Sequence, residues 1–172
     1  MRMETERLIV RGYRLTDESD VREYMLQRVN AEFEAYPDFT PAKSGEEIAF
    51  RCLSDEFFAI ELKAERKVIG NVYLGHREWN ARELGYVLNT RYLRQGYGTE
   101  ACRAAVAWCF AQGTHRVYAE CAPGNAASWR LMEKLGMRRE AHFIQNASFR
   151  KDACGNPIYW DTYVYALLNP AD

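Results

Sequence analysis

The stretch Arg94-Gln95-Gly96-Tyr97-Gly98-Thr99 decides how this sequence is interpreted. It places two glycines at the start of a segment, Thr99 to Phe110, whose apolar residues recur on one broad helical face, and Gly113 follows as a stop signal. The first amides of a helix have no carbonyl partner within it, and glycine lets the backbone curl around an anion. The stretch therefore predicts a phosphate-binding loop that opens a helix.

Two other interpretations of the glycines compete with this one. The pattern Gly96-x-Gly98-x-x-Ala101, with Glu120 about twenty residues further on, also matches the fingerprint of dinucleotide-binding folds. In that fold the first glycine closely follows the first strand, whereas here residues 89–95 intervene and several predicted strands come earlier. A tight turn into a helix would need one glycine and gives no reason for two beside Arg94. The pyrophosphate site is therefore the favoured interpretation.

The segments around this loop predict a mixed sheet with helices packed on it, as a single α/β domain over residues 1–172. Upstream of the loop, alternation and helical spacing predict strands at Arg7–Leu15, Phe57–Leu62, Val68–Leu74 and Glu83–Leu88, and helices near Asp20–Val29 and Glu46–Leu53. Downstream, they predict a strand at Val117–Cys121, a helix at Asn125–Leu135, and strands near Met137–Ile144 and Tyr159–Leu168 around a polar loop.

Composition and charge disfavour several classes of protein. The 172 residues are 48% hydrophobic and 27% charged, which suits one globular core. With 23 Lys and Arg against 24 Asp and Glu, the chain has no bulk field to attract nucleic acid or anionic lipid. The longest apolar run, Ala104–Ala111, is too short to cross a bilayer, and the N-terminus does not resemble a secretory signal. We therefore expect a cytoplasmic location.

Cysteine and histidine do not form a metal-binding pattern in this sequence. The five cysteines are widely spaced and include no C-x-x-C pair, so free thiols are predicted. His76, His115 and His142 share no metal-ligand spacing. No metal site is therefore predicted.

The glycine loop and a second helix start resemble the GCN5-related N-acetyltransferase (GNAT) family. The family's pyrophosphate motif is Gln or Arg, two residues, Gly, any residue, then Gly or Ala, and it corresponds to Leu93-Arg94-Gln95-Gly96-Tyr97-Gly98. Leu93 departs from the motif, so one side-chain anchor is missing while the backbone cradle remains. A second block, Asn125-Ala126-Ala127-Ser128 followed by Glu133-Lys134-Leu135-Gly136-Met137, resembles the RimJ/RimL-like branch, which acetylates the N-termini of ribosomal proteins.

The resemblance implies a fold, a cosubstrate and an activity. The implied fold is a mixed, mostly antiparallel central sheet with helices on both faces. The implied activity is direct transfer of an acetyl group from acetyl-CoA to a primary amine, either a protein N-terminus or a small amine. The strand containing residues 86–88 is expected to splay from its neighbour and to pair with pantetheine through its backbone. The residues expected to bind the cofactor are Tyr86, Val87, Leu88, Arg94, Gln95, Gly96, Tyr97, Gly98, Thr99, Asn125 and Lys134.

Amide formation from a thioester needs a neutral amine and a proton for the departing thiolate. Met132 stands where many relatives have a donor tyrosine, so the resemblance indicates Ser128 as the donor. Alternatively, Ser128 bonds its own helix backbone. Asn125 is expected to cap the helix and to bond the pantetheine arm. Glu83 resembles the catalytic Glu of histone-acetylating relatives and could relay a proton through water; alternatively, it is an exposed strand-end carboxylate.

A non-catalytic acyl-CoA-binding sensor or partner-binding module is the alternative function, because Leu93 and Met132 depart from the family pattern. The acceptor groove is expected between residues 17–53 and the loop at 150–157, where Glu32, Glu34 and Tyr36 could meet a cationic amine. A sheet of this kind can also pair through edges or helices into a homodimer.

Overall fold

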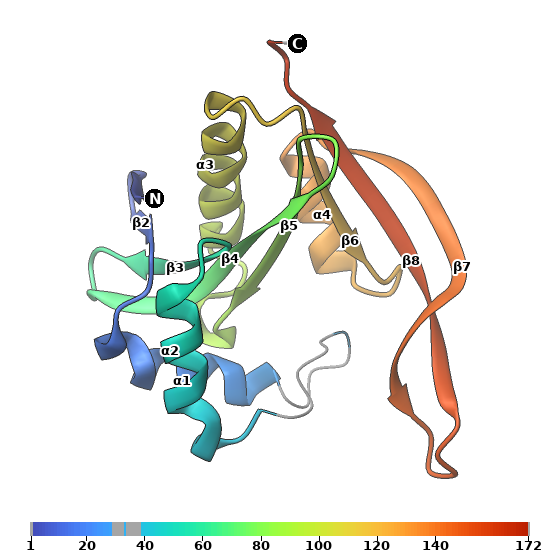
Figure 1. The fold of residues 1–172 in the computed structure, drawn as a ribbon, viewed down its shortest axis with the longest axis horizontal. Helices are drawn as coiled ribbons and strands as arrows, with labels where there is room; N and C mark the ends of the chain where they lie inside the picture. Colours follow the sequence, from blue (N-terminus) through green and yellow to red (C-terminus); the bar gives the residue numbers. More distant parts are fainter. Residues whose placement is uncertain (1, 29–32, 34–38, 172) are drawn as a thin grey trace.

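The computed structural model describes residues 2–28, 33 and 39–171. These residues form an eight-stranded sheet in the order β1-β2-β3-β4-β5-β6-β8-β7 (Figure 1). Its strands are β1 (Arg2–Glu4), β2 (Leu8–Arg11), β3 (Phe57–Leu62), β4 (Lys67–Arg77), β5 (Ala81–Leu88), β6 (Arg116–Cys121), β7 (Arg138–Lys151) and β8 (Pro157–Leu168). Neighbouring strands are antiparallel except for the parallel pair β5 and β6. The prediction of a mixed, mostly antiparallel sheet is confirmed.

Helices cover both faces of this sheet, as predicted. They are α1 (Glu18–Arg28), α2 (Ser44–Leu53), α3 (Tyr97–Ala111) and α4 (Ala126–Lys134), with short 3-10 turns η1 (Leu15–Asp17), η2 (Pro41–Lys43) and η3 (Thr90–Tyr92). On one face, residues of α1 and α2 share a buried cluster with Ala59, Val68 and Val87. On the other face, α3 and α4 contribute to the larger core (Figure 1). None of the helices in the described part of the chain combines the length and apolar character that a bilayer crossing needs.

Small residues bring α3 close to the sheet. Its buried positions are Gly98, Ala101, Cys102, Ala105, Val106 and Cys109. A Cβ on Gly98 would lie 3.1 Å from side-chain carbons of Leu88 and Leu131, tighter than ordinary van der Waals contact. Gly98 therefore lets the first turn of α3 pack between β5 and α4, in addition to any part it has in holding an anion.

The parallel pairing of β5 and β6 stops halfway along both strands. It comprises Ala81 with Arg116, Arg82 with Val117, and Glu83 with Tyr118. Beyond that point β5 continues to pair with β4, and β6 continues to pair with β8. We call this divergence, between residues 84–88 and residues 119–121, the β5–β6 split. It opens the sheet next to the start of α4.

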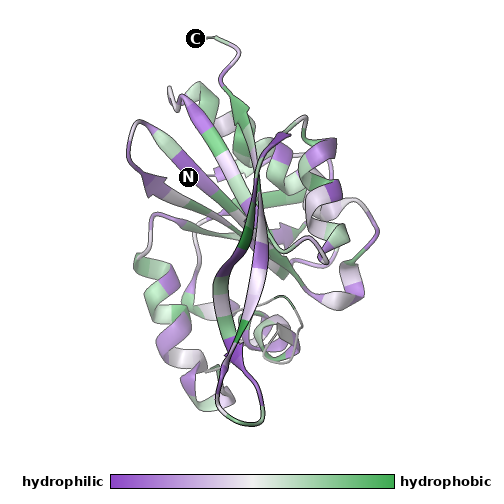
Figure 2. Cartoon of the chain, turned by 90° about the vertical axis from the view of Figure 1, so that its right-hand side faces the viewer, coloured by the Kyte–Doolittle hydropathy of each residue, from purple (hydrophilic) through white to green (hydrophobic). Residues whose placement is uncertain are grey.

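Several element boundaries differ from the prediction. The first predicted strand is shorter, Leu8–Arg11, and a further strand, β1, precedes it. The predicted strand Met137–Ile144 instead runs from Arg138 to Lys151 and forms a long hairpin with β8, seen in front in Figure 2. The register of this hairpin shifts at three places, so its sequence lacks the regular alternation that indicates a strand. The predicted end of the first helix, at Val29, lies outside the described residues.

Candidate active site

The loop between η3 and α3 has the backbone geometry of an anion site. Gly96 precedes the helix with φ +84°, and Arg94 adopts φ +60°. Left-handed residues in such a turn direct successive N–H groups to one side. The first amides of α3, from Tyr97 onward, lack carbonyl partners within the helix. Because Arg94, Gln95 and Gly96 are exposed, a diphosphate can approach these amides from solvent.

The predicted pantetheine-binding residues lie in β5 beyond the start of the β5–β6 split. The side chains of Val87 and Leu88 are buried, Val87 in the α1–α2 cluster and Leu88 in the larger core. Only their backbone groups can therefore face a ligand at the split. Lys134, also predicted to bind the cofactor, is exposed in the last turn of α4, where its carbonyl accepts a hydrogen bond from Arg103 (3.1 Å).

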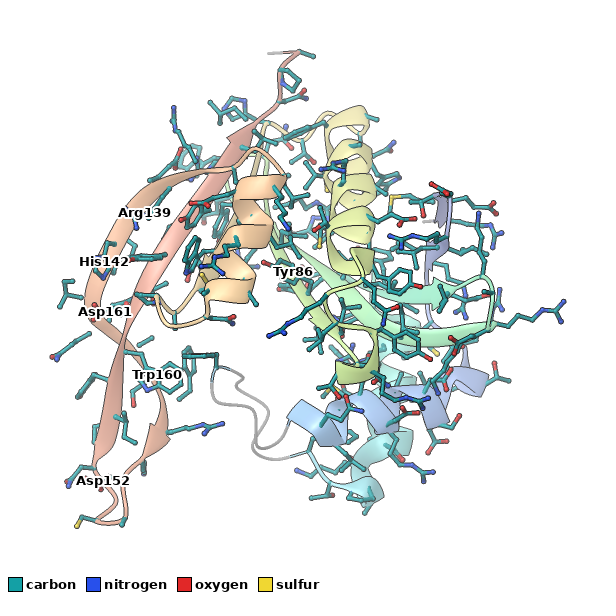
Figure 3. The ribbon with its side chains drawn as sticks, turned by 180° about the vertical axis from the view of Figure 1, so that it is seen from behind. Tyr86, Arg139, His142, Asp152, Trp160 and Asp161 are labelled. Atoms are coloured by element: carbon teal, nitrogen blue, oxygen red, sulfur yellow. The ribbon has the colours of Figure 1, made fainter. Side chains whose placement is uncertain are left out.

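Asn125 and Ser128 form the start of α4. The Asn125 side chain accepts a hydrogen bond from the Ser128 amide (3.2 Å), so its predicted capping role is confirmed. The Ser128 hydroxyl lies 2.9 Å from the hydroxyl of Tyr86, which also donates to the Ser128 carbonyl (3.0 Å). Figure 3 shows Tyr86 between α3 and α4. The Ser128 hydroxyl thus meets a phenol that comes from β5, on the other side of the split.

Two neighbours complete the surroundings of Ser128. Met132 is 1% exposed and belongs to the core, so it leaves the start of α4 without a donor at that position. Burial raises the pKa of the Cys121 thiol at the end of β6, and a hydrogen bond with Ser128 offsets part of this rise. The sequence does not predict this contact between Cys121 and Ser128, because it depends on where β6 ends relative to α4.

Two carboxylates lie at the β5–β6 split on the face of the sheet opposite to Tyr86 and Ser128. Glu83 pairs in register with Tyr118, and Glu120 lies two residues further along β6, so all three point to one face. Tyr86, three residues after Glu83, points to the other face. Glu83 forms an ion pair with Arg77. Glu120 is exposed, but partial burial of its carboxylate raises its pKa, the negative charge of Glu83 raises it further, and Arg77 acts in the opposite direction.

The sequence pattern links Glu120 only to a ribose-binding role in a dinucleotide-binding fold. Its position beside Glu83 depends on the parallel register of β5 and β6, which local patterns do not reveal. A separate pair, His142 and Asp161 (2.8 Å), lies on the β7–β8 hairpin, away from Tyr86 (Figure 3). The structure therefore brings Tyr86, Ser128, Glu83 and Glu120 to the β5–β6 split, with the phosphate loop next to it.

Comparison with known proteins identifies the family. Residues 7–138 match the acetyltransferase (GNAT) domain. The chain belongs to the GNAT family. It is 31% identical to an uncharacterized N-acetyltransferase, YnaD, of Bacillus subtilis (strain 168), over 98% of this chain and 97% of YnaD. The structure of a GNAT-family acetyltransferase from Bacillus anthracis is 30% identical, with a TM-score of 0.89 over 98% of this chain and 99% of that one.

A structure with lower sequence identity is similar in fold along its whole length. It is RimL, the ribosomal L7/L12 alpha-N-protein acetyltransferase, in complex with coenzyme A; it is 17% identical, with a TM-score of 0.83 and full coverage of both chains. These findings confirm the predicted GNAT fold and N-acetyltransferase class. Acetyl-CoA is the cosubstrate predicted for this acetyltransferase (GNAT) domain, and two structures of similar fold, RimL and the microcin C7 self-immunity acetyltransferase MccE, were solved with coenzyme A and with acetyl-CoA, respectively.

Proposed function

We propose that this GNAT protein transfers the acetyl group of acetyl-CoA to a primary amine, either a protein N-terminus or a small amine. The observation that supports the proposal is the β5–β6 split, which has the Tyr86–Ser128 pair on one face and Glu83 with Glu120 on the other. Acetyl transfer needs a proton donor for the thiol and a proton acceptor for the amine. The two faces offer these two groups on opposite sides of one opening.

The cofactor-binding part of the proposal uses mainly backbone groups. The amides of Gly96, Tyr97, Gly98 and Thr99 would hold the diphosphate at the start of α3. The backbone of Tyr86, Val87 and Leu88 would pair with the pantetheine arm and provide an amide for the developing oxyanion. The side chains of Arg94, Gln95, Asn125 and Lys134 would add polar contacts from the loop and from α4.

The proton donor in this proposal is Ser128. Its hydroxyl is held by Tyr86, so it has a fixed orientation at the start of α4 rather than that of a freely rotating surface serine. Acetyl-CoA supplies the acetyl group as a thioester whose departing thiolate needs a proton. Ser128 would donate its hydroxyl proton to that thiolate, the phenol of Tyr86 would return a proton to Ser128, and solvent would restore the proton of Tyr86.

The proton acceptor is a carboxylate of the opposite face. Glu83 was predicted for this role, and its ion pair with Arg77 fixes its position. A general base works best with a pKa raised towards the working pH, which favours Glu120 as the group that takes the proton. Glu83 would then act through Glu120, because its negative charge raises the pKa of Glu120.

A protein N-terminus is supported as acceptor by the similarity to RimL, whose name describes an alpha-N-protein acetyltransferase. Glu32, Glu34 and Tyr36, predicted to face the acceptor, lie outside the described residues. The hairpin exposes Phe143, Ile144 and Phe149, which a second copy of the chain could cover, and this supports the homodimer as part of the proposal. A cytoplasmic location also belongs to the proposal.

Purified protein with radiolabelled acetyl-CoA tests the function directly. The acceptors are peptides with a free N-terminus, the same peptides with a blocked N-terminus and one internal lysine, and small primary amines. We expect label to appear on at least one of these classes. If calorimetry shows that coenzyme A binds but no acceptor in the panel receives label, the non-catalytic sensor would replace the proposal.

A further inference from the structure

The phosphate loop is tied to the turn between β1 and β2 by Arg7. Its Nη1 donates to the carbonyl oxygen of Gln95 (3.0 Å). Its Nε and Nη2 contact Oε2 of Glu100 at 2.7 and 2.6 Å, and its backbone amide donates to Oε1 (3.0 Å). The guanidinium also lies 4.4 Å from the ring centroid of Tyr97. A residue more than eighty positions upstream thus contacts both the loop and the first turn of α3.

Glu100 is an unexpected residue beside an anion site. A carboxylate in the first turn of a helix is attracted by the same amides that a diphosphate would use, and it repels a bound phosphate. Burial raises the pKa of Glu100, but hydrogen bonds from Thr5 and Arg7 outweigh it and lower the pKa below its ordinary value. The lowered pKa keeps Glu100 ionised near neutral pH.

We propose that Arg7 is a positioning residue for coenzyme A, which cancels the charge of Glu100 and fixes the Gln95 carbonyl so that the loop amides meet the diphosphate unopposed. Glu100 and Gln95 take three of the five guanidinium N–H groups, one from each nitrogen, so the contacts of Arg7 are those of a residue that acts through these two partners. The inference rests on the role of this loop in the proposed function.

The surroundings of the pair fit an electrostatic role. The Glu100 side chain is 18% exposed, so water screens its charge only in part, whereas the Arg7 side chain is 41% exposed and open to solvent and salt. A Cβ on Gly96 would lie 3.3 Å from Nη2 of Arg7, so the glycine also leaves room for the guanidinium. Replacing Arg7 alone would leave the Glu100 carboxylate uncompensated at the mouth of the helix.

Calorimetric titration of coenzyme A into four proteins tests the inference: wild type, Arg7→Met, Glu100→Gln and the double variant. We expect Arg7→Met to weaken binding about tenfold or more, because an unpaired carboxylate remains beside the diphosphate. Glu100→Gln should bind at least as tightly as the wild type, and the double variant should recover to within about threefold of it. A double variant as weak as Arg7→Met, or an Arg7→Met variant that binds normally, would overturn the inference.

Two further measurements distinguish neutralisation of the Glu100 charge by Arg7 from a purely structural role of Arg7 in stabilising the fold. Salt screens exposed charges, so raising the ionic strength should reduce the deficit of Arg7→Met relative to wild type, whereas a deficit that does not change with salt would contradict the inference. Arg7→Lys keeps the charge and should bind more tightly than Arg7→Met at equal thermal stability. If Arg7→Lys is no better than Arg7→Met, the charge is not what matters.

The pair Arg116 and Glu140 is a matched control. It also joins two separate elements, and Arg116 also lies over a tyrosine ring, that of Tyr118. Arg116→Met and Glu140→Gln should leave coenzyme A binding unchanged; a loss equal to that of Arg7→Met would show that any broken ion pair has this effect and would overturn the inference. No acceptor is present in these titrations, so a failed transfer assay would contradict the proposed function and not this inference.

Discussion

Ser128 differs from an ordinary first-turn serine because its hydroxyl contacts Tyr86. We predict that Ser128→Ala lowers kcat about a hundredfold, the usual contribution of a general acid, while affinity for coenzyme A stays within about twofold. Tyr86→Phe should have a smaller effect, because it removes the partner that orients the hydroxyl and leaves the donor. Steady-state kinetics with a responsive acceptor checks this, with Ser148→Ala in the hairpin as the control. Full activity of Ser128→Ala would exclude it as the donor.

Glu83 and Glu120 can be separated by their effects on pH dependence. The base must be ionised, so kcat/KM should rise with pH as Glu120 loses its proton, above the ordinary carboxyl value of 4.5. Glu120→Gln should abolish this acidic limb and lower the plateau about a hundredfold. Glu83→Gln removes a negative charge, which lowers the pKa of Glu120 and moves the limb to lower pH. An unchanged limb in Glu120→Gln would assign the base elsewhere.

At the scale of elements, a buried ion pair joins β2 to η1. Arg11 contacts both carboxylate oxygens of Asp17, at 2.8 and 3.0 Å, and both residues are 6% exposed. Asp17→Asn leaves the buried guanidinium with one carboxylate, Glu61, so we expect a loss of about 3 kcal/mol in the free energy of unfolding.

Urea unfolding measures this loss. Glu140→Gln, which breaks the ion pairs of Glu140 with Arg116 and with the exposed Arg138, is the control and should cost less than about 1 kcal/mol. An equal loss of unfolding free energy in Asp17→Asn and Glu140→Gln would show that the buried ion pair stabilises the protein no more than exposed ion pairs do.

The β4–β5 hairpin contains a turn whose sequence does not suit its conformation. Trp79 and Asn80 have φ +59° and +54°, and Ala81 donates to the Glu78 carbonyl (3.3 Å), which indicates a type I′ turn. Tryptophan is unfavourable there, whereas asparagine tolerates left-handed backbone. Because Trp79 is 86% exposed, Trp79→Asn should stabilise the protein by about 0.5–1 kcal/mol and raise Tm by a few degrees.

Differential scanning calorimetry checks this expectation. Leu53→Asn, at a position 89% exposed, controls for the loss of an apolar surface group and should change stability by less than about 0.5 kcal/mol. A Tm of Trp79→Asn that is equal to or lower than that of the wild type would contradict the assignment of strain to this turn.

Local sequence patterns predicted the helices at the candidate active site better than they predicted the contacts between distant residues there. The start of α3 and the Asn125 cap are encoded within a few residues, by glycines and a capping side chain, and were predicted. The contact between Tyr86 and Ser128 spans 42 positions and depends on strand register, as does the placement of Glu120 beside Glu83. The length of the β7–β8 hairpin was missed because its bulges interrupt the alternation.

At the scale of the whole molecule, the sheet consists of two parts that join along a short parallel ladder. β1 to β5 form one part, and β6, β8 and β7 form the other. Within the described residues, the ladder across the junction joins residues 81–83 to residues 116–118, and the His115 amide adds a hydrogen bond to the Asn80 carbonyl (3.0 Å) at its near end. Beyond residues 83 and 118 the two parts diverge, next to the starts of α3 and α4. The function proposed for this GNAT protein depends on that divergence, because it joins the phosphate loop on one face to the carboxylates on the other.

Hydrogen exchange of backbone amides, with and without coenzyme A, tests this arrangement most directly. Bound coenzyme A should slow exchange at residues 85–88 and 96–99 and at the start of α4, and should leave residues 143–151 of the hairpin unchanged. Binding that protects other segments while residues 85–88 and 96–99 exchange as before would contradict the account.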